Sequence, residues 1–383
     1  MKKIIAILLV VLMLIPAFAL GENVVKIGVF EPASGDSGAG GKQETLGMQY
    51  ANSVQPTVEI GGETYQVELV YADNGSSPDK APSAAQQLVS AGVSVVLGSY
   101  GSGVSIAGSQ YFADAGIPAI GVSCTNPQVT AGNTHYFRVC FLDPFQGTAL
   151  ANYSFKELGA KTAYCLAELG NDYDVGLCHY FKQAFEALGG TVIAETFPNG
   201  NSDFTSYLSS ATALNAEVFF CPVSIAYSTQ IINQAASQNV TFPIIGSDTL
   251  DSNKVIEAAK GTAVKLFITT FYQEGGTPEF DTGFKAWLNQ NKDALTNNGG
   301  NDMISAVSAL GYDAYFVALE ALKAAGTTDS KAVNEALWKV SYTGVTGAIA
   351  FNEIGDANRD SAYIKTANTE TGVWDFVTVQ KVD

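Results

Sequence analysis

The sequence predicts an α/β fold made of two doubly wound parallel-sheet lobes, and three observations lead to this prediction. The chain has 383 residues, which suits two domains at about 150 residues each. Apolar, β-rich runs alternate with helical stretches, and this alternation occurs in two successive series. The predicted strands are apolar on both faces, as in parallel sheets that helices cover on both sides.

The first series ends near residue 140. Its strands are short apolar runs, among them VVKIGVF at 24–30 and VSVVLG at 93–98. Helical stretches separate these runs, which predicts parallel neighbours in one sheet. The expected strands are 24–30, 65–72, 93–98, 118–122 and 136–140, with helices near 42–53, 80–91 and 103–115.

The second series repeats the pattern with five further strands. It begins at the helix that follows FLDPFQ (141–146), where we expect the chain to cross between the lobes. The strands are expected at 161–167, 191–197, 217–223, 243–247 and 264–271, and the helices near 146–158, 173–188, 203–214, 226–238 and 252–260.

The end of the chain differs from both series. Another crossing is expected at YQEGGTP (272–278), and long helices are expected near 278–293 and 303–325. Short runs separated by Gly, Asn and Asp turns then predict antiparallel strands. These strands are expected at 347–351, 361–367 and 373–379.

The first 19 residues have the organisation of a secretory signal peptide. Lys2 and Lys3 precede an almost wholly apolar run at 4–16, and Ala17-Phe18-Ala19 then has the small-x-small pattern of a cleavage site. The apolar run is shorter than the roughly 20 residues of a membrane span, although an uncleaved anchor is the alternative. No Cys follows the run, so we expect no lipid anchor. We expect a soluble, periplasmic or otherwise extracytoplasmic mature protein.

Charge and composition exclude several classes of protein. Lys and Arg number 20 and Asp and Glu 37, so the net charge is −17, which would repel the phosphate backbone of nucleic acids. Hydrophobic residues make up 47%, which is enough to fill sizeable cores and too many for a disordered chain. With two His and five Cys, the chain has little material for a metal site. We expect neither a metal nor a cofactor.

The five cysteines are an odd number, so at least one thiol is free or pairs with another molecule. No Cys-x-x-Cys pattern occurs, which argues against redox catalysis and zinc ribbons. Cys165 and Cys178 are one candidate disulfide, because a strand and its following helix could bring them close. Five buried, reduced cysteines are the alternative. The five are Cys124, Cys140, Cys165, Cys178 and Cys221.

Two motifs that suggest enzymes fail on inspection. Gly35-Asp36-Ser37-Gly38 resembles the nucleophile segment of trypsin-like proteases, but no His precedes Ser37 and the α/β pattern does not suit that fold. The glycine run before Lys42 resembles a phosphate-binding loop, but Asp36 and Gln43 stand where that motif needs Gly and Ser or Thr. We therefore expect a non-enzymatic protein.

Three loops are better candidates for a binding site, because each follows a predicted strand at its carboxyl end. Gly98–Gly103 opens a helix with hydroxyls and free N–H groups, which suits a carboxylate, although helix capping by Ser102 is the plainer interpretation. The 123–127 loop should lie at the same sheet edge. In the second series Asp248 could pair with an ammonium, or could simply cap a helix.

At these loops the sequence resembles the type I periplasmic binding proteins of ABC transporters, and most closely the leucine–isoleucine–valine-binding branch. Six segments carry the resemblance, which covers essentially the whole mature chain. They are KIGVFEPASG at 26–35, VVLGSYGSGVSIA at 95–107, AGIPAIGVSCTNPQVT at 115–130, FRVCFLDPFQG at 137–147, NDYDVG at 171–176 and GTVIAETFPNGNSDFTSYL at 190–208.

The resemblance implies two α/β lobes that are joined by three crossings and close over a ligand. We expect the signal peptide at 1–19, the first lobe at 20–140 plus 274–340, and the second at 141–273 plus 341–383. A monomer is expected.

The resemblance also implies roles for individual residues. The family's helix-opening Ser and its T-N-P loop bind an amino-acid carboxylate, which implies Ser102 and Thr125, with a backbone group of Ser123. An acidic residue of the second lobe holds the ammonium, which implies Asp248. A Tyr of the family's ligand site falls on Tyr173, although Asp174 stands where the family usually has Gly. Tyr100 is expected to narrow the pocket or to add an aromatic wall to it.

We therefore expect an extracytoplasmic solute-binding protein that captures an apolar, branched-chain or aromatic α-amino acid and delivers it to an ABC transporter permease. Another small solute, such as an amide, urea or an aromatic acid, is the alternative within this class. A ligand-sensing module for a receptor is the alternative outside it.

Overall fold

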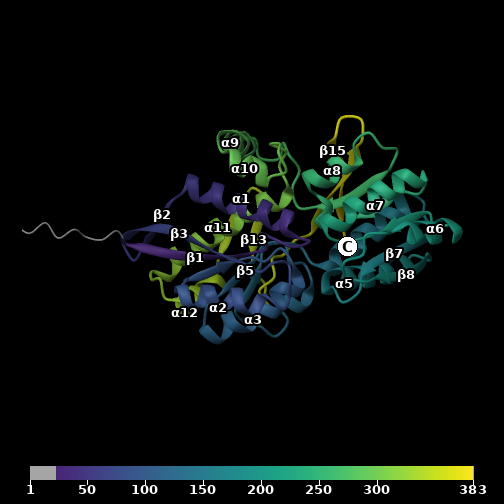
Figure 1. Cartoon of the computed structure of the whole chain (residues 1–383). Helices are drawn as coiled ribbons and strands as arrows, with labels where there is room; N and C mark the ends of the chain where they lie inside the picture. Colours follow the sequence, from purple (N-terminus) through teal and green to yellow (C-terminus); the bar gives the residue numbers. More distant parts are fainter. Residues whose placement is uncertain (1–22, 383) are drawn as a thin grey trace, which may run out of the picture.

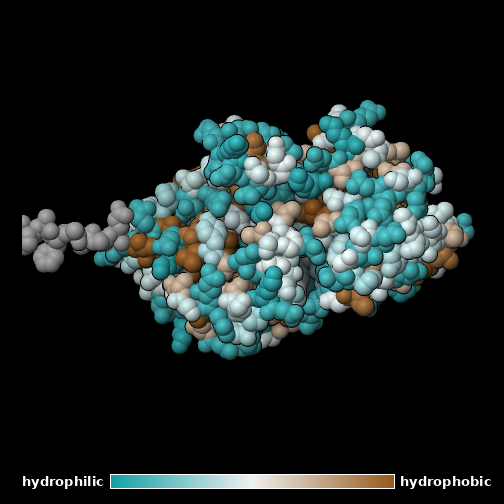
Figure 2. Space-filling model, in the orientation of Figure 1, coloured by the Kyte–Doolittle hydropathy of each residue, from teal (hydrophilic) through white to brown (hydrophobic). Residues whose placement is uncertain are grey.

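The computed structural model describes residues 23–382, so the expected signal peptide at 1–19 lies outside the described residues. Figure 1 shows two lobes side by side, each built on its own sheet, and Figure 2 shows a furrow on a largely hydrophilic face where they meet. Within residues 23–382, no helix combines the length and apolarity that a membrane crossing requires.

The sheet of the first lobe has six strands, of which all but one run parallel. β2 is the exception, because it pairs antiparallel with β3 at the edge of the sheet through a tight turn at Gly61-Gly62. The sequence analysis missed β2, which has four residues. In sheet order the strands are β2 (Thr57–Ile60), β3 (Glu63–Asp73), β1 (Val24–Glu31), β4 (Val95–Leu97), β5 (Ala119–Gly121) and β6 (Tyr136–Arg138).

Helices cover both faces of this sheet. On one face α1 packs along α11, and on the other α2 packs against α3. The first-lobe helices are α1 (Gly38–Val54), α2 (Ala81–Ala91), α3 (Ser102–Ala115), α9 (Pro278–Gln290), α10 (Lys292–Asn297), α11 (Ala306–Ala325) and α12 (Ser330–Leu337), with a 3-10 turn η1 (Pro127–Val129).

The sheet of the second lobe has seven strands. Five are parallel, and two antiparallel strands from the end of the chain extend the sheet beyond β11. In sheet order they are β15 (Val373–Lys381), β14 (Ser361–Asn368), β11 (Leu266–Thr270), β10 (Ile244–Gly246), β9 (Val218–Phe220), β7 (Thr162–Glu168) and β8 (Thr191–Phe197).

The second lobe also has helices on both faces, which confirms the predicted doubly wound arrangement. Neighbouring residues of β7 enter separate cores, Tyr164 and Leu166 on one face and Cys165 on the other. The helices are α4 (Asp143–Asn152), which continues as η2 (Tyr153–Glu157), then α5 (Asp172–Ala187), α6 (Thr205–Ala213), α7 (Ile225–Gln238), η3 (Asp248–Leu250) and α8 (Asn253–Ala259).

The third crossing lies later in the chain than we expected. We placed residues 341–383 in the second lobe, but the hairpin β12 (Ser341–Gly344) and β13 (Gly347–Ala350) packs on α11. Tyr342 stacks on Phe316, and Asp313 accepts hydrogen bonds from the backbone of residues 345 and 346. These contacts keep the hairpin on the first lobe, so the chain crosses between β13 and β14.

All five cysteines are buried, free thiols, as in the alternative of five buried, reduced cysteines. Cys165 on β7 and Cys178 on α5 are neighbours in the same core, and burial first and then the Cys165 thiol raise the pKa of Cys178. The structure therefore confirms their proximity but not the disulfide.

Candidate functional site

The loop after β4 brings Tyr100 and Ser102 to the cleft between the lobes. Ser102 begins α3 and is 1% exposed, and its Oγ accepts a hydrogen bond from the Asn126 backbone N–H at 3.2 Å. The first N–H groups of a helix have no partner within the helix. This loop therefore presents a hydroxyl and backbone donors, which is the chemistry that a carboxylate requires.

The neighbouring loop after β5 contributes Ser123 and Thr125. The Ser123 hydroxyl donates to Glu44 of α1, whereas the buried Thr125 hydroxyl makes no hydrogen bond to a described residue. Arg138 holds the loop in place by donating to the carbonyls of Cys124 and Asn126, at 3.0 and 2.5 Å. The loop therefore holds Thr125 in a fixed position, and the Thr125 hydroxyl can donate a hydrogen bond to a ligand.

On the second lobe Asp248 follows β10 and is 1% exposed. Its Oδ1 accepts a hydrogen bond from the Tyr173 hydroxyl at 2.6 Å, and its backbone N–H donates to Gln146 Oε1 at 2.9 Å. Its other oxygen, Oδ2, has no partner among the described residues. Burial, with a smaller contribution from the Asp251 charge, raises the pKa of Asp248 to about 6 despite the Tyr173 hydrogen bond and the neighbouring Gln146 amide.

Tyr100 connects the two lobes directly. Its hydroxyl donates to the backbone carbonyl of Thr249 at 3.2 Å, so the cleft is closed at this point. The ring lies against Gly40 of α1, where a Cβ would come within 2.4 Å of two ring carbons. Gly40 is therefore the residue that makes room for the Tyr100 side chain.

These residues surround a single region between the lobes. Tyr100, Ser102 and Tyr173 line a cavity of about 230 Å³ that the loops after β4 and β7 enclose. Ser123, Thr125 and Asp248 do not line this cavity and lie buried behind it. The structure thus brings the six residues into one neighbourhood, and their role in binding stays a prediction.

Three buried carboxyl groups behind the cavity were not found from the sequence. Glu31 at the end of β1 accepts a hydrogen bond from the Tyr100 backbone N–H at 2.8 Å, and its pKa is raised by burial and by Glu44. Burial also raises the pKa of Glu44 to about 7 and that of Asp143 to about 8. Glu31 ends a parallel strand, which is the signal that could have identified it.

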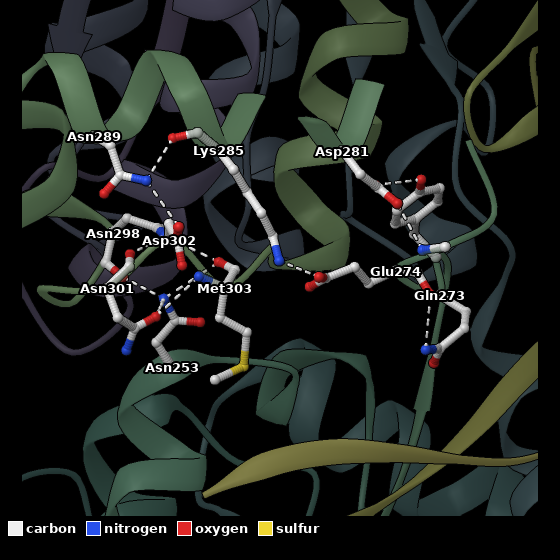
Figure 3. Close-up of polar contacts among 12 residues, drawn as sticks. Asn253, Gln273, Glu274, Asp281, Lys285, Asn289, Asn298, Asn301, Asp302 and Met303 are labelled. Atoms are coloured by element: carbon white, nitrogen blue, oxygen red, sulfur yellow. Dashed lines mark hydrogen bonds and ion pairs between the residues drawn. The ribbon is translucent and has the colours of Figure 1, made fainter. Parts of the chain in front are cut away.

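A second and larger hollow, of about 720 Å³, lies between α9 and the β14–β15 strands (Figure 3). Asn253 of α8 donates to Asn301 at 2.9 Å, which bridges the lobes beside this hollow. Its two lysines are both paired with carboxylates, Lys285 with Glu274 and Lys365 with Asp251. The hollow therefore combines two ion pairs with contacts between the lobes, and its other carboxylates, Asp281 and Asp302, accept hydrogen bonds from neutral groups.

Comparison with known proteins identifies related chains. The model of a family described as periplasmic binding protein matches residues 24–370. A Leu/Ile/Val-binding protein homolog 1 from Brucella melitensis is 29% identical over 337 residues, which cover 87% of this chain and 87% of the relative.

Two solved structures share the fold over nearly the whole chain. A leucine-binding protein, LivK, from Thermotoga maritima is 32% identical with a TM-score of 0.83, covering 94% of this chain and 99% of that chain. A solute-binding protein of an ABC transporter from R. palustris, solved in complex with benzoate, is 21% identical with a TM-score of 0.79 and coverages of 93% and 96%. The second likeness shows the fold alone.

Proposed function

Because the chain belongs to the family of periplasmic binding proteins, we propose that it captures an α-amino acid between its two lobes and delivers it to the permease of an ABC transporter. The protein acts by binding and carries out no bond chemistry. The related chains are named for leucine or for Leu, Ile and Val, which supports an amino acid as the ligand.

The observation that carries the proposal is a pair of buried polar atoms, one in each lobe, that make no hydrogen bond of good geometry within residues 23–382. The Thr125 hydroxyl belongs to the first lobe and Asp248 Oδ2 to the second. Asp143 does lie beside Thr125, and the Gln146 amide lies beside Asp248. A buried polar group without a hydrogen bond is unfavourable, so both atoms favour a ligand that supplies the missing partners. A ligand carboxylate accepts from Thr125 and Ser102, and a ligand ammonium donates to Asp248.

The mechanism follows from this division of roles. A ligand that carries both charged groups contacts both lobes only when the cleft is closed. Its affinity is therefore higher for the closed form, and its binding shifts the population of the protein toward that form. The closed form is the one that we propose docks on the permease.

Export of the chain fits this role. We propose that residues 1–19 direct secretion and are removed, and that the mature protein works as a monomer in the periplasm or its equivalent, with no lipid anchor. Lys2 and Lys3, the apolar run at 4–16 and the small-x-small pattern at 17–19 support this proposal.

A thermal-shift screen of the twenty amino acids, with benzoate as the comparison solute, tests the proposal. A ligand at 100 times its dissociation constant stabilises the folded state by about 2.7 kcal/mol, which raises the melting temperature by a few degrees. We expect at least one amino acid to produce this rise and benzoate to produce none. A rise with benzoate alone would favour the aromatic-acid alternative and contradict the proposal.

A further inference from the structure

The cavity has an acidic wall on the second lobe. Glu168, Asp172 and Asp174 line it beside Tyr173, and none of its described lining residues is Lys, Arg or His. The protein as a whole carries a net charge of −17, so the wall adds to a field that already attracts cations. A cavity of this charge disfavours an anionic ligand.

Of the three acidic residues, Glu168 is the one whose charge is not stabilised by a helix N-terminus. Asp172 and Asp174 lie in the first turn of α5, where carboxylates interact favourably with the helix dipole. Glu168, in contrast, is the last residue of β7 and is 7% exposed. A buried carboxylate outside a helix terminus is stabilised by a cationic partner. Unlike the buried Glu31 and Glu44, Glu168 lines the cavity, where a ligand can supply that cation.

The Glu168 carboxylate has neutral hydrogen-bond donors and no cationic partner among the described residues. Two other carboxylates lie close to it: Asp174 accepts from the Glu168 backbone N–H, and Asp36 shares the Tyr227 hydroxyl. The Oε1 atom of Glu168 accepts hydrogen bonds from Asn199 Nδ2 at 2.6 Å and from the Tyr227 hydroxyl at 3.2 Å. Its Oε2 accepts from Asn171 Nδ2 at 3.1 Å. These donors hold the carboxylate in a fixed orientation at the cavity wall, but they do not neutralise it.

Three cations of the described residues, two of them buried, already pair with carboxylates. Arg138 pairs with Asp356 at 2.7 Å, and Lys365 pairs with Asp251 at 3.0 Å. Lys285, in the second hollow shown in Figure 3, pairs with Glu274. The second hollow therefore contains two lysines of its own, whereas the cavity lined by Glu168 has no Lys, Arg or His among its described lining residues.

Glu168 lines the cavity, and Asp248 lies outside the lining but accepts from the hydroxyl of Tyr173, which does line it. These are two acidic positions, and one α-ammonium satisfies only one of them. Tyr173 lies between these positions, because its hydroxyl bonds Asp248 while its backbone N–H bonds Asn171, which itself donates to Glu168. A second cation on the ligand would occupy the position at Glu168.

We infer that the ligand is an α-amino acid whose side chain ends in a nitrogen cation, an ammonium or a guanidinium, and that Glu168 holds this cation. The inference rests on the proposed function and replaces the apolar or aromatic side chain that the resemblance implies. Pro78, Val104 and Tyr100 line the same cavity and give the methylene groups of such a side chain an apolar surface.

Calorimetric titration with two matched pairs of amino acids tests the inference. Lysine and norleucine differ by the terminal ammonium, and arginine and citrulline are nearly the same size but differ in charge. We expect the cationic member of at least one pair to bind about ten- to a hundredfold more tightly than its neutral partner, as for a hydrogen bond to a charged group.

A Glu168→Gln variant locates the effect. Its affinity for the preferred cationic amino acid should fall about ten- to a hundredfold, while the affinity for the neutral partner stays the same. Glu186→Gln is the matched control, because this residue of the same lobe is 43% exposed and its change alters the net charge equally. Melting curves without ligand check that both variants fold. If a variant does not fold, the titrations of the wild-type protein with the matched pairs still test the inference.

The outcomes separate the inference from the proposed function. If neutral amino acids bind as tightly as their cationic partners, or if leucine binds and neither cationic amino acid does, the inference is wrong and the proposed function stands. If no amino acid binds at all, both are wrong. Equal loss of affinity in Glu186→Gln and Glu168→Gln would also overturn the inference, because the effect would then come from net charge.

Discussion

Replacing Asp248 by Asn removes the charge that we assign to the ligand ammonium and keeps the side chain's size. Asn retains an oxygen that can accept from the Tyr173 hydroxyl, which lies 2.6 Å from Asp248 Oδ1. Breaking a buried charged pair from one side costs about 3–5 kcal/mol. Affinity for the amino acid should therefore fall at least about a hundredfold.

The same change should not destabilise the ligand-free protein. Folding raises the pKa of Asp248 from 3.8 to about 6. At pH values above about 6, the ionised carboxylate therefore lowers the free energy of unfolding by about 3 kcal/mol. Asn removes this cost. At about pH 7.5 the melting temperature without ligand should therefore stay the same or rise while binding is lost.

Calorimetry gives the affinity, and melting curves without ligand give the stability. Asp375→Asn serves as a control, because it makes the same change in charge on an exposed position of β15 in the second lobe. Unchanged affinity in Asp248→Asn would refute the assignment of Asp248. A loss of affinity that accompanies a large fall in melting temperature would show instead that the residue acts through folding.

Three further predictions concern the first lobe, pH and shape. Ser102→Ala and Thr125→Ala each remove a hydroxyl donor, so calorimetry should show affinities about ten- to a hundredfold lower. Because the pKa values of Glu44 and Asp143 are raised to about 7 and about 8, the folded protein keeps protons that the unfolded chain releases. Its melting temperature without ligand should therefore fall as the pH rises from about 5.5 to about 8. Small-angle scattering should show a more compact protein with ligand than without it, and Asp248→Asn should impair this closure even at saturating ligand.

Each of these predictions has a result that would contradict it. Full affinity in both hydroxyl variants would mean that the carboxylate binds elsewhere. A melting temperature that rises with pH over this range would mean that the buried carboxyl groups are ionised and stabilised. Identical scattering curves for free and saturated wild type would favour a rigid site over a hinged one.

The sequence predicted the fold and the position of the cleft because both depend on local patterns. Alternating apolar runs and helices specify parallel sheets, and the carboxyl ends of parallel strands meet at one edge. That rule placed Ser102 and Thr125 at one edge of the first sheet, after β4 and β5, whereas Asp248 follows β10 of the second sheet and was expected to face them across a cleft. The third crossing was misplaced because the contacts of the β12–β13 hairpin with α11 are not visible in local sequence.

The buried carboxyl groups escaped prediction because their burial depends on distant segments. Glu44 lies within α1, and its local sequence does not indicate that it is buried. In the folded protein α11 and the Ser123 loop cover it completely. Glu168 ends β7, so the strand-end rule could have identified it. Its significance depends on the neutral partners that Asn171, Asn199 and Tyr227 provide after folding.

The proposal that one amino acid bridges the two lobes is tested most directly with three forms of the same ligand. The amino acid that stabilises the protein in the screen is titrated beside its carboxamide, which lacks the carboxylate, and its deaminated acid, which lacks the ammonium. Calorimetry should show that both analogues bind at least about tenfold more weakly than the parent, because each loses its charged contacts with one lobe. If either analogue binds as tightly as the parent, the corresponding lobe does not recognise that group, and the account of the site is wrong.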